Sequence, residues 1–419
     1  MSDAHNFFGK KKINIPYEAR YIINVLYESN FEAYVVGGCV RDCLLGKNPK
    51  DWDITTNAKP DEIKKIFNGI AKIIETGIAH GTLTIILNKQ KFEVTTYRTD
   101  GFYRDYRRPD SVNFVNDLKE DLSRRDFCMN AIAYNNCDGL IDLFDGVKDI
   151  SEKKIRCVGN PEKRFTEDAL RMLRALRLAN QLDFCIDDIS YLVLKKKAEI
   201  IKFISIERIH DELVKLFSAL NINKIYLIKE SGILKFINHD FYIYFDKHFD
   251  GIKKNLARIR LFGCDENIDT ILAAVLYKMK ACCAYDLLRF LRFDNKTCNK
   301  IKVILSYLYK KIIADKYLVK GLITRIGIEN FYELLVLKKI IGYKNIECIK
   351  VLADEILAAN ECIFLKDLKI NGNDIKRLGF SGKDVGCVLN YLLDVVHNLP
   401  EKNLRDTLVC EVNKLREKF

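Results

Sequence analysis

Two aspartates separated by a single residue, Asp51 and Asp53, are the first candidates for chemistry in this sequence. Alternate residues of a β-strand share a face, so a strand through this segment would point both carboxylates in the same direction. Neighbouring carboxylates repel each other unless a positive charge lies between them. Mg2+ prefers oxygen ligands and usually combines one or two protein carboxylates with substrate phosphates. The spacing therefore predicts a Mg2+ site that handles a phosphate-bearing substrate.

A pair of glycines precedes the aspartates and could supply the phosphate-binding half of such a site. The apolar run 34–36 predicts a strand that ends in Gly37-Gly38, and a short helix is expected from about residue 40 to 45. Glycine lacks a Cβ atom, so its backbone N–H groups can approach a triphosphate closely where a helix begins. A glycine pair alone is usually a turn, and an Asp-x-Asp pair alone is usually a solvated loop. Their combination in this order is more specific for a site that binds a metal ion and phosphate.

The same stretch resembles the first motif of a known enzyme family. Gly-Gly-Cys-Val-Arg-Asp-Cys-Leu-Leu-Gly followed by Asp-Trp-Asp is similar to that motif in the class II tRNA nucleotidyltransferases (CCA-adding enzymes) and the related bacterial poly(A) polymerases. The resemblance implies that Asp51 and Asp53 hold two Mg2+ ions. It also implies that Gly37, Gly38 and Arg41 bind the incoming nucleotide.

A third carboxylate is predicted on a neighbouring strand. The β-rich segments 81–87 and 91–98 are joined by Asn-Lys-Gln, which predicts a hairpin. On spacing alone, Glu93 in the second strand is more often a surface residue. The segment Phe-Glu-Val-Thr-Thr-Tyr-Arg around it resembles the family's third-carboxylate strand, which implies that Glu93 joins Asp51 and Asp53 in catalysis.

Residues 120–134 carry a basic cluster on a stretch that we expect to be helical. Arg124, Arg125 and Asp126 precede an apolar face, and the simplest interpretation is a local Arg–Asp pair. The pattern Arg-Arg-Asp-x-x-x-Asn-Ala resembles the family's second motif, which implies that Arg125 holds the sugar or phosphates of the nucleotide. The polar loop 99–113 resembles a flexible loop that the family needs to add the terminal A.

A helix with a stripe of charges is predicted to begin near Thr166 as its N-cap. Asp168, Arg171, Arg174 and Arg177 are spaced by three, so they form a stripe along a helix that is otherwise mostly apolar. An ion pair between Asp168 and Arg171, with the other arginines reaching for solvent, is the simplest interpretation.

The alternative interpretation of this stripe is base recognition. Cytosine and adenine each present an amino donor beside a ring-nitrogen acceptor, which a carboxylate and a guanidinium can bind together. Uracil and guanine would leave these buried charges unpaired, so such a site can discriminate strongly. Glu-Asp-x-x-Arg at 167–171 resembles the family's motif, which implies that Asp168 and Arg171 act as a protein template for CTP and ATP. Arg174 and Arg177 resemble further nucleotide-binding positions.

The composition suits a reduced, globular RNA-binding protein. Lysine and arginine total 69 against 57 aspartates and glutamates, a net charge of +12 that favours a polyanion such as tRNA, although other proteins share it. The 14 cysteines include no Cys-x-x-Cys, which favours free thiols in a cytoplasmic protein. No run of about 18 apolar residues occurs, so no membrane span is expected.

We predict an α+β fold, with an N-terminal polymerase-β-like nucleotidyltransferase head built on a mixed sheet and an all-α neck, body and tail. No proline occurs between Pro161 and Pro400, which favours helices over that length. The predicted parts are a catalytic head (1–140), a nucleotide-selecting neck (141–205), a body (206–330) and a tRNA-binding tail (331–419). Predicted helices include 186–202, 206–220, 268–294, 297–314, 331–341 and 383–397. Within the second of them, Arg-x-x-x-Glu-x-x-Lys at 208–215 resembles a fifth motif and is interpreted as structural.

The resemblance implies stepwise addition of C, C and A to the 3′ end of tRNA from CTP and ATP, without a nucleic-acid template and with release of pyrophosphate. An A-adding enzyme that works with a separate CC-adder stays open. A poly(A) polymerase is less favoured, because the basic stretch that marks the bacterial polymerases is missing after the first motif. A phosphohydrolase would need more suitably placed histidines than the six present. A non-catalytic RNA-binding protein would be free to lose Asp51 and Asp53, so the presence of both aspartates argues against that class. The oligomeric state is left open.

Overall fold

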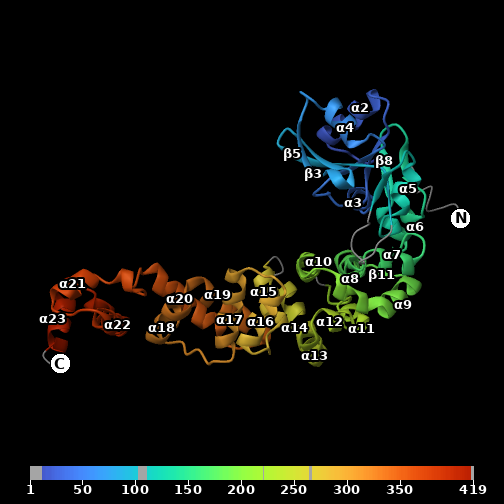
Figure 1. Ribbon diagram of the computed structural model, residues 1–419. Coiled ribbons are helices and arrows are strands. Elements are labelled where there is room, and N and C mark those ends of the chain that lie inside the picture. The colour runs from blue at the N-terminus through green and yellow to red at the C-terminus, as the bar shows by residue number, and fades with distance from the viewer. Residues whose placement is uncertain (1–11, 102–110, 220, 264–266, 417–419) are drawn as a thin grey trace. The chain divides into compact units, whose positions relative to one another are not determined.

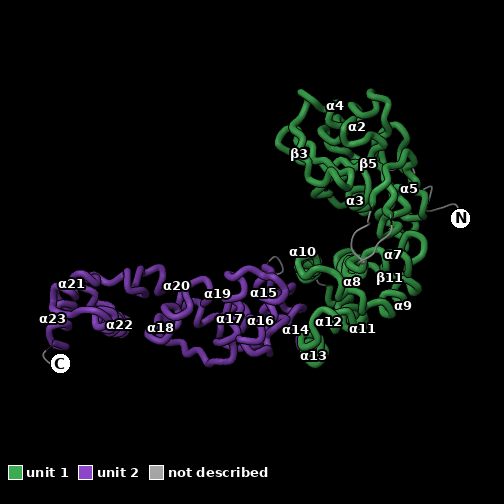
Figure 2. The backbone as a smooth tube through the Cα atoms, viewed as in Figure 1, with its two compact units in different colours: residues 1–247 green, residues 248–419 purple. Residues whose placement is uncertain are grey.

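The computed structural model describes residues 12–101, 111–219, 221–263 and 267–416. The chain divides into two compact units, residues 1–247 and residues 248–419, which Figure 2 colours separately. The finer division into head, neck, body and tail stays a prediction.

Among the described residues of the first unit, seven strands form a mixed sheet in the order β3-β4-β5-β2-β1-β8-β9. Figure 1 labels three of them, β3, β5 and β8. The strands are β1 (Ala33–Val36), β2 (Asp53–Thr56), β3 (Lys72–Gly77), β4 (Thr82–Leu87), β5 (Gln90–Thr96), β8 (Ile132–Asn135) and β9 (Gly139–Asp142). β2 and β5 run parallel, whereas the other neighbours are antiparallel. Helix α2 (Tyr17–Glu28) packs on β1 and on α4 (Pro60–Ile66). The predicted α+β class is confirmed.

The central strands fix where the candidate carboxylates lie. All four residues of β1 are buried, as its apolar run requires. On β5, Phe92 and Val94 are buried while Glu93 between them is exposed, so Glu93 faces away from that part of the core. Strand β2 begins at Asp53, and Asp51 lies just before it. The strand predicted to carry both aspartates therefore carries only the second.

The prediction of a helix over 120–134 is wrong for its second half. Helix α5 (Leu118–Ser123) ends early, and a short 3-10 turn (Cys128–Asn130) leads into β8. All four residues of β8 are buried, between β1 and β9. Burial on the sheet, which no local pattern reports, outweighs the local helical preference. The polar loop 99–113 also contains structure at its ends, because β6 (Arg98–Asp100) pairs with β7 (Val112–Phe114). Its residues 102–110 lie outside the described ranges.

Two helices replace the single one predicted around the arginine stripe. Asn160 caps α7 (Pro161–Glu167), accepting from two backbone N–H groups, and proline occupies the first helical position. Thr166 is therefore inside a helix, where its hydroxyl donates to the Glu162 carbonyl at 2.7 Å, and the N-cap prediction is wrong. Asp168 has an extended backbone (φ −140°, ψ 104°) and separates α7 from α8 (Leu170–Leu182). Asp168 therefore lies outside α8, and its side chain does not share the regular spacing of the arginines on that helix.

Most of the remaining elements in the described part of the first unit are helices. The helices are α6 (Gly146–Ser151), α9 (Asp188–Lys197), α10 (Ile206–Ser218), α11 (Tyr226–Ser231), α12 (Ile233–Ile237) and α13 (His239–Lys247). Two short strands, β10 (Lys154–Ile155) and β11 (Cys185–Ile186), pair beside α8. The last three helices of this list fall in a segment that the sequence pattern left without an assignment.

The described part of the second unit is built from helices. They are α14 (Phe249–Leu261), α15 (Ile268–Val275), α16 (Ala281–Phe290), α17 (Asn295–Leu308), α18 (Lys316–Ile326), α19 (Ile328–Ile341), α20 (Ile346–Ala358), α21 (Gly372–Arg377), α22 (Lys383–Asn398) and α23 (Arg405–Arg416). The helix predicted over 268–294 is two helices, because the apolar periodicity continues across a turn that no proline or glycine marks. Within the residues that the structure places, no helix is both long and apolar enough to cross a membrane.

Candidate active site

A strongly basic cavity of about 370 Å³ lies in the first unit. Its described lining contains six arginines and two aspartates together with Leu170: Arg98, Arg124, Arg125, Arg171, Arg174, Arg208, Asp126 and Asp168. These residues come from β6, the α5 to β8 connection, the break between α7 and α8, α8 itself and α10. The excess of guanidinium groups makes the cavity suited to a polyanion such as a triphosphate.

Asp53 and Glu93 are cross-strand neighbours. They occupy the same register position of the parallel pair β2 and β5, so their Cα atoms are about 4.8 Å apart. Desolvation and the nearby Glu93 carboxylate raise the pKa of Asp53, while Arg125 and Arg174 oppose that rise. Asp51 is exposed two residues away. The structure thus places Glu93 opposite Asp53, and the joint catalytic role of Glu93 with Asp51 and Asp53 stays a prediction.

A divalent cation fits this arrangement only with help from a substrate. Among the described residues, no group of three or more His, Cys, Asp or Glu side chains is arranged to hold a metal ion by itself. Burial and the Glu93 carboxylate raise the pKa of Asp53, so a cation beside Asp53 would stabilise its ionised form. Asp51 and Asp53 therefore suit a cation whose remaining ligands are phosphate oxygens and water.

The glycine pair lies against the arginines. Gly37 has φ +86° and precedes α3 (Gly38–Leu44), and a Cβ atom there would come within 3.2 Å of Nη1 of Arg125. Only glycine meets both the backbone and the space requirement. Arg125 donates from Nη2 to Asp121 at 3.2 Å, and its buried Nε has no hydrogen-bond partner among the described residues. Arg125 itself lines the cavity.

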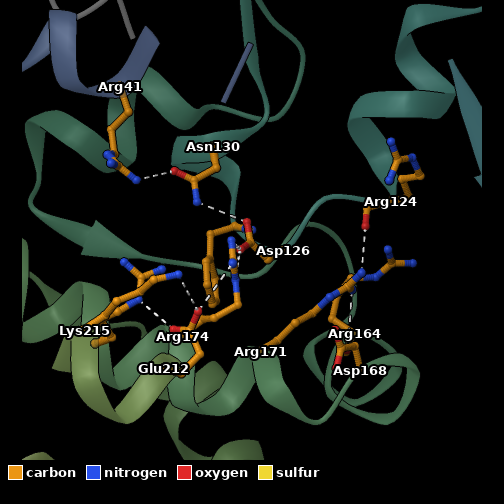
Figure 3. A network of polar contacts seen from close by, with 12 residues as sticks. Arg41, Arg124, Asp126, Asn130, Arg164, Asp168, Arg171, Arg174, Glu212 and Lys215 are labelled. Carbon is orange, nitrogen blue, oxygen red and sulfur yellow. Dashed lines mark hydrogen bonds and ion pairs between the residues drawn. The ribbon is translucent and has the colours of Figure 1, made fainter. Parts of the chain in front are cut away.

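A chain of polar contacts joins Arg41 of α3 to Arg174 of α8 (Figure 3). Arg41 is buried and donates to Asn130 at 2.7 Å, and Asn130 donates to Asp126 at 3.1 Å. Arg174 donates to Oδ2 of Asp126 from Nε at 2.8 Å and from Nη2 at 2.6 Å. Although burial alone raises the pKa of Asp126, Arg174 and Asn130 hold it well below its usual range. Asp126 is therefore ionised and joins segments far apart in the sequence.

The local pair expected for Asp126 is not formed. Arg124 and Arg125 both contact the fully buried carboxylate of Asp121 instead, at 2.6 and 3.2 Å. Thr55 also donates to Asp121, at 3.2 Å. Asp121 thus holds both arginines at the cavity, a role that the sequence pattern did not reveal.

The expected ion pair between Asp168 and Arg171 is also absent. Arg171 donates to Glu167 at 3.1 Å and to the Arg124 carbonyl at 3.0 Å. Asp168 is bound by Arg208, whose Nη2 and Nη1 lie 2.8 and 3.3 Å from its two oxygens. Arg208 belongs to the motif that was interpreted as structural. Its position in the cavity lining was therefore missed by the sequence analysis.

Arg177 lies outside the cavity lining, unlike Arg171 and Arg174. It donates to Glu212 at 2.7 Å and to Gln181 at 2.9 Å. Glu212 is buried and also lies 3.9 Å from Arg174. A role for Arg177 at the nucleotide stays a prediction.

Comparison with known proteins agrees with this geometry. Residues 33–156 match the family model "Poly A polymerase head domain", and residues 183–242 match "Probable RNA and SrmB- binding site of polymerase A". The CCA-adding enzyme of Ligilactobacillus salivarius is 38% identical over 392 residues, which cover 90% of this chain and 92% of that protein. That of Staphylococcus aureus is 49% identical over 207 residues, 49% of this chain and 51% of that one.

The solved structures agree in fold. The crystal structure of the Bacillus stearothermophilus CCA-adding enzyme in complex with CTP is 29% identical and has a TM-score of 0.78, covering 96% of this chain and 98% of that one. Similarity that extends over nearly the whole length of both chains shows that this chain belongs to the family of CCA-adding enzymes, which are tRNA nucleotidyltransferases.

Proposed function

We propose that this chain adds C, C and A in turn to the 3′ end of tRNA, using CTP and ATP and no nucleic-acid template. In each addition the tRNA 3′-oxygen forms a bond to the α-phosphorus, the bond from that phosphorus to the β-phosphate oxygen breaks, and pyrophosphate leaves. The observation that carries the proposal is the arginine-lined cavity, two of whose arginines, Arg125 and Arg174, interact electrostatically with Asp53. It combines a place for a triphosphate with carboxylates that need a cation.

The family implies a divalent metal, and we propose Mg2+ held by Asp51 and Asp53. When bound, such an ion stabilises the charge that develops on the attacking and leaving oxygens. Glu93 would lie beside this position, across from Asp53 in the sheet. The backbone of Gly37 and Gly38, together with Arg41 and Arg125, would contact the phosphates.

Base selection is proposed for Asp168 and Arg171. The Asp168 carboxylate would accept from the amino group of cytosine or adenine, and Arg171 would donate to the ring nitrogen. The described contacts use three of the five N–H groups of Arg171, so two are left to donate to a base. The same contacts fix the guanidinium plane. Uracil and guanine would place a donor against a donor or an acceptor against an acceptor.

Recognition of tRNA is proposed for the helical remainder of the chain, including residues 331–419. Duplex RNA is recognised mainly through its shape and backbone. The described cysteines are free thiols, which fits the reducing cytoplasm that we propose as the site of action.

The function can be tested by extending three tRNA transcripts that end before CCA, after C and after CC. Each is incubated with CTP alone, ATP alone and both, and products are resolved on gels. We expect the mixture to extend all three and to stop after A. Extension of only the transcript that ends in CC would show an A-adding enzyme, and unlimited addition of A would show a poly(A) polymerase. Asp61→Asn, which changes an exposed carboxylate on α4, serves as the active control.

A further inference from the structure

The carboxylate of Asp168 is held from a distant helix. Arg208 on α10 donates to both of its oxygens, to Oδ2 at 2.8 Å and to Oδ1 at 3.3 Å. The backbone N–H of Leu170 also donates to Oδ1, at 3.1 Å. Two-point contact between a guanidinium and a carboxylate fixes the plane of both groups. The orientation of Asp168 is thus set by a residue 40 positions later in the sequence.

These contacts leave little freedom for a further donor. A carboxylate has about four lone-pair sites, two on each oxygen. Within the described part of the chain, Oδ1 accepts from Arg208 and from the Leu170 N–H, and Oδ2 accepts from Arg208 alone. One acceptor site therefore stays open, on Oδ2. Because Asp168 and Arg208 both line the cavity, this site is positioned for one N–H group of a nucleotide base.

We propose that Arg208 is a specificity-determining positioning residue: it orients the Asp168 carboxylate so that a single acceptor site faces the base. This inference rests on the proposed role of Asp168 in base selection. An amino group of cytosine or adenine satisfies the open site. A carbonyl oxygen of uracil or guanine at the same place faces a second oxygen and is rejected.

Loss of Arg208 should weaken selection more than catalysis. Without the guanidinium, Asp168 can rotate about its side-chain bonds, and water can bind its vacated sites. A bound water can donate to a carbonyl oxygen as well as accept from an amino group, so it would reduce the penalty against uracil and guanine. The proposed chemistry at Asp53 and Glu93 does not involve this contact.

The test is Arg208→Met, which keeps the length of the side chain and removes every donor. The transcript that ends before CCA is extended by one nucleotide with CTP or UTP, and the ratio of the two kcat/KM values is measured. We expect this ratio to fall about ten- to a hundredfold, the usual effect of a hydrogen bond to a charged group. Arg208→Lys, which can bind one oxygen at a time, should give an intermediate ratio.

A matched control is Arg156→Gln. Arg156 also pairs with an aspartate, Asp149 at 3.2 Å, but does not line the cavity, so the ratio should not change. If Arg208→Met lowers the melting temperature and slows the addition of both nucleotides equally, so that the ratio is unchanged, Arg208 is merely structural and the inference is overturned.

The double variant tests whether Arg208 acts through Asp168. Asp168→Asn alone should lower the CTP to UTP ratio, and adding Arg208→Met should lower it little further. If Asp168→Asn leaves the ratio unchanged, the proposed base selection by Asp168 fails. If Asp168→Asn lowers the ratio and Arg208→Met does not, only the inference about Arg208 fails.

Discussion

Replacing Arg174 by methionine should destabilise the first unit, because it leaves a buried carboxylate without its main partner. Asp126 is 8% exposed and accepts two hydrogen bonds from Arg174, at 2.8 and 2.6 Å. Among the residues that the structure describes, Asn130 and the Phe127 N–H would be the remaining donors to it. Removing one partner of a buried ion pair costs about 3–5 kcal/mol. Since the Arg174 side chain is 37% exposed, we expect the lower end of that range, about 3 kcal/mol.

The expected loss can be measured as a melting temperature. A unit of 150–250 residues loses about 2–4 °C per kcal/mol, which gives about 6–12 °C for this variant. The assay is thermal unfolding of the full chain at pH 7, followed by circular dichroism. Lys154→Met is the control, since it breaks an exposed pair with Glu152 and should shift the transition by less than about 2 °C.

The effect should also depend on pH in a defined direction. The pKa of Asp126 is held well below its usual range in the folded chain, and an unfolded aspartate has a pKa of about 3.9. The pair therefore stabilises the fold fully above pH 4, and this contribution is lost as the pH falls below it. The difference between wild type and Arg174→Met should shrink correspondingly. A difference below 2 °C at pH 7, or one that does not shrink in acid, would refute this account of the pair.

Three further predictions follow from the site and from the second unit. Asp53→Asn should abolish nucleotide transfer while tRNA binding, measured by filter retention, changes less than about twofold; retained turnover would remove the metal role. Gly37→Ala should cost about 1–3 kcal/mol of unfolding free energy and raise the KM for CTP and ATP, because its backbone (φ +86°, ψ −130°) is one that residues other than glycine rarely adopt, and because Arg125 lies 3.2 Å from the added methyl group. Gly386→Ala in α22 meets open space and should be neutral or stabilising. Burial lowers the pKa of Lys338 to about 8, so the unfolded chain binds more protons above that pH. Chemical denaturation should show wild type gaining stability relative to Lys338→Met between pH 8 and 10, and an unchanged difference would show that Lys338 does not titrate there.

The sequence predicts best what is encoded locally. The glycine pair, the short helix after it and the alternation along β5 all depend on neighbouring residues, and they are found where they were expected. The register that brings Glu93 beside Asp53 follows from the strand order, which local patterns do not contain. The family resemblance supplied that information instead. The same limit explains why β8 was predicted as helix, since only its burial within the sheet distinguishes it.

Ion pairs were predicted least well, because opposite charges close in the sequence need not choose each other. Asp126 follows Arg124 and Arg125 directly but binds Arg174, and Asp168 binds Arg208 in preference to Arg171. A helical wheel ranks partners by distance along one helix. In the folded chain, the break at Asp168 removes the i,i+3 geometry on which such a ranking depends.

The three arginines of α8 show what this rearrangement achieves. They are spaced by three on the helix, yet Arg171 pairs with Glu167, Arg174 with Asp126, and Arg177 with Glu212. Each acceptor lies on a different segment: the end of α7, the connection that leads to β8, and α10. One interpretation of the sequence assigned this stripe to base recognition. In the structure its arginines connect α8 to these three segments by ion pairs. Because Arg171 and Arg174 also line the cavity, the contacts that position α8 and those that would hold a nucleotide share the same guanidinium groups. Variants of this stripe should thus be interpreted only when stability and nucleotide selection are measured together.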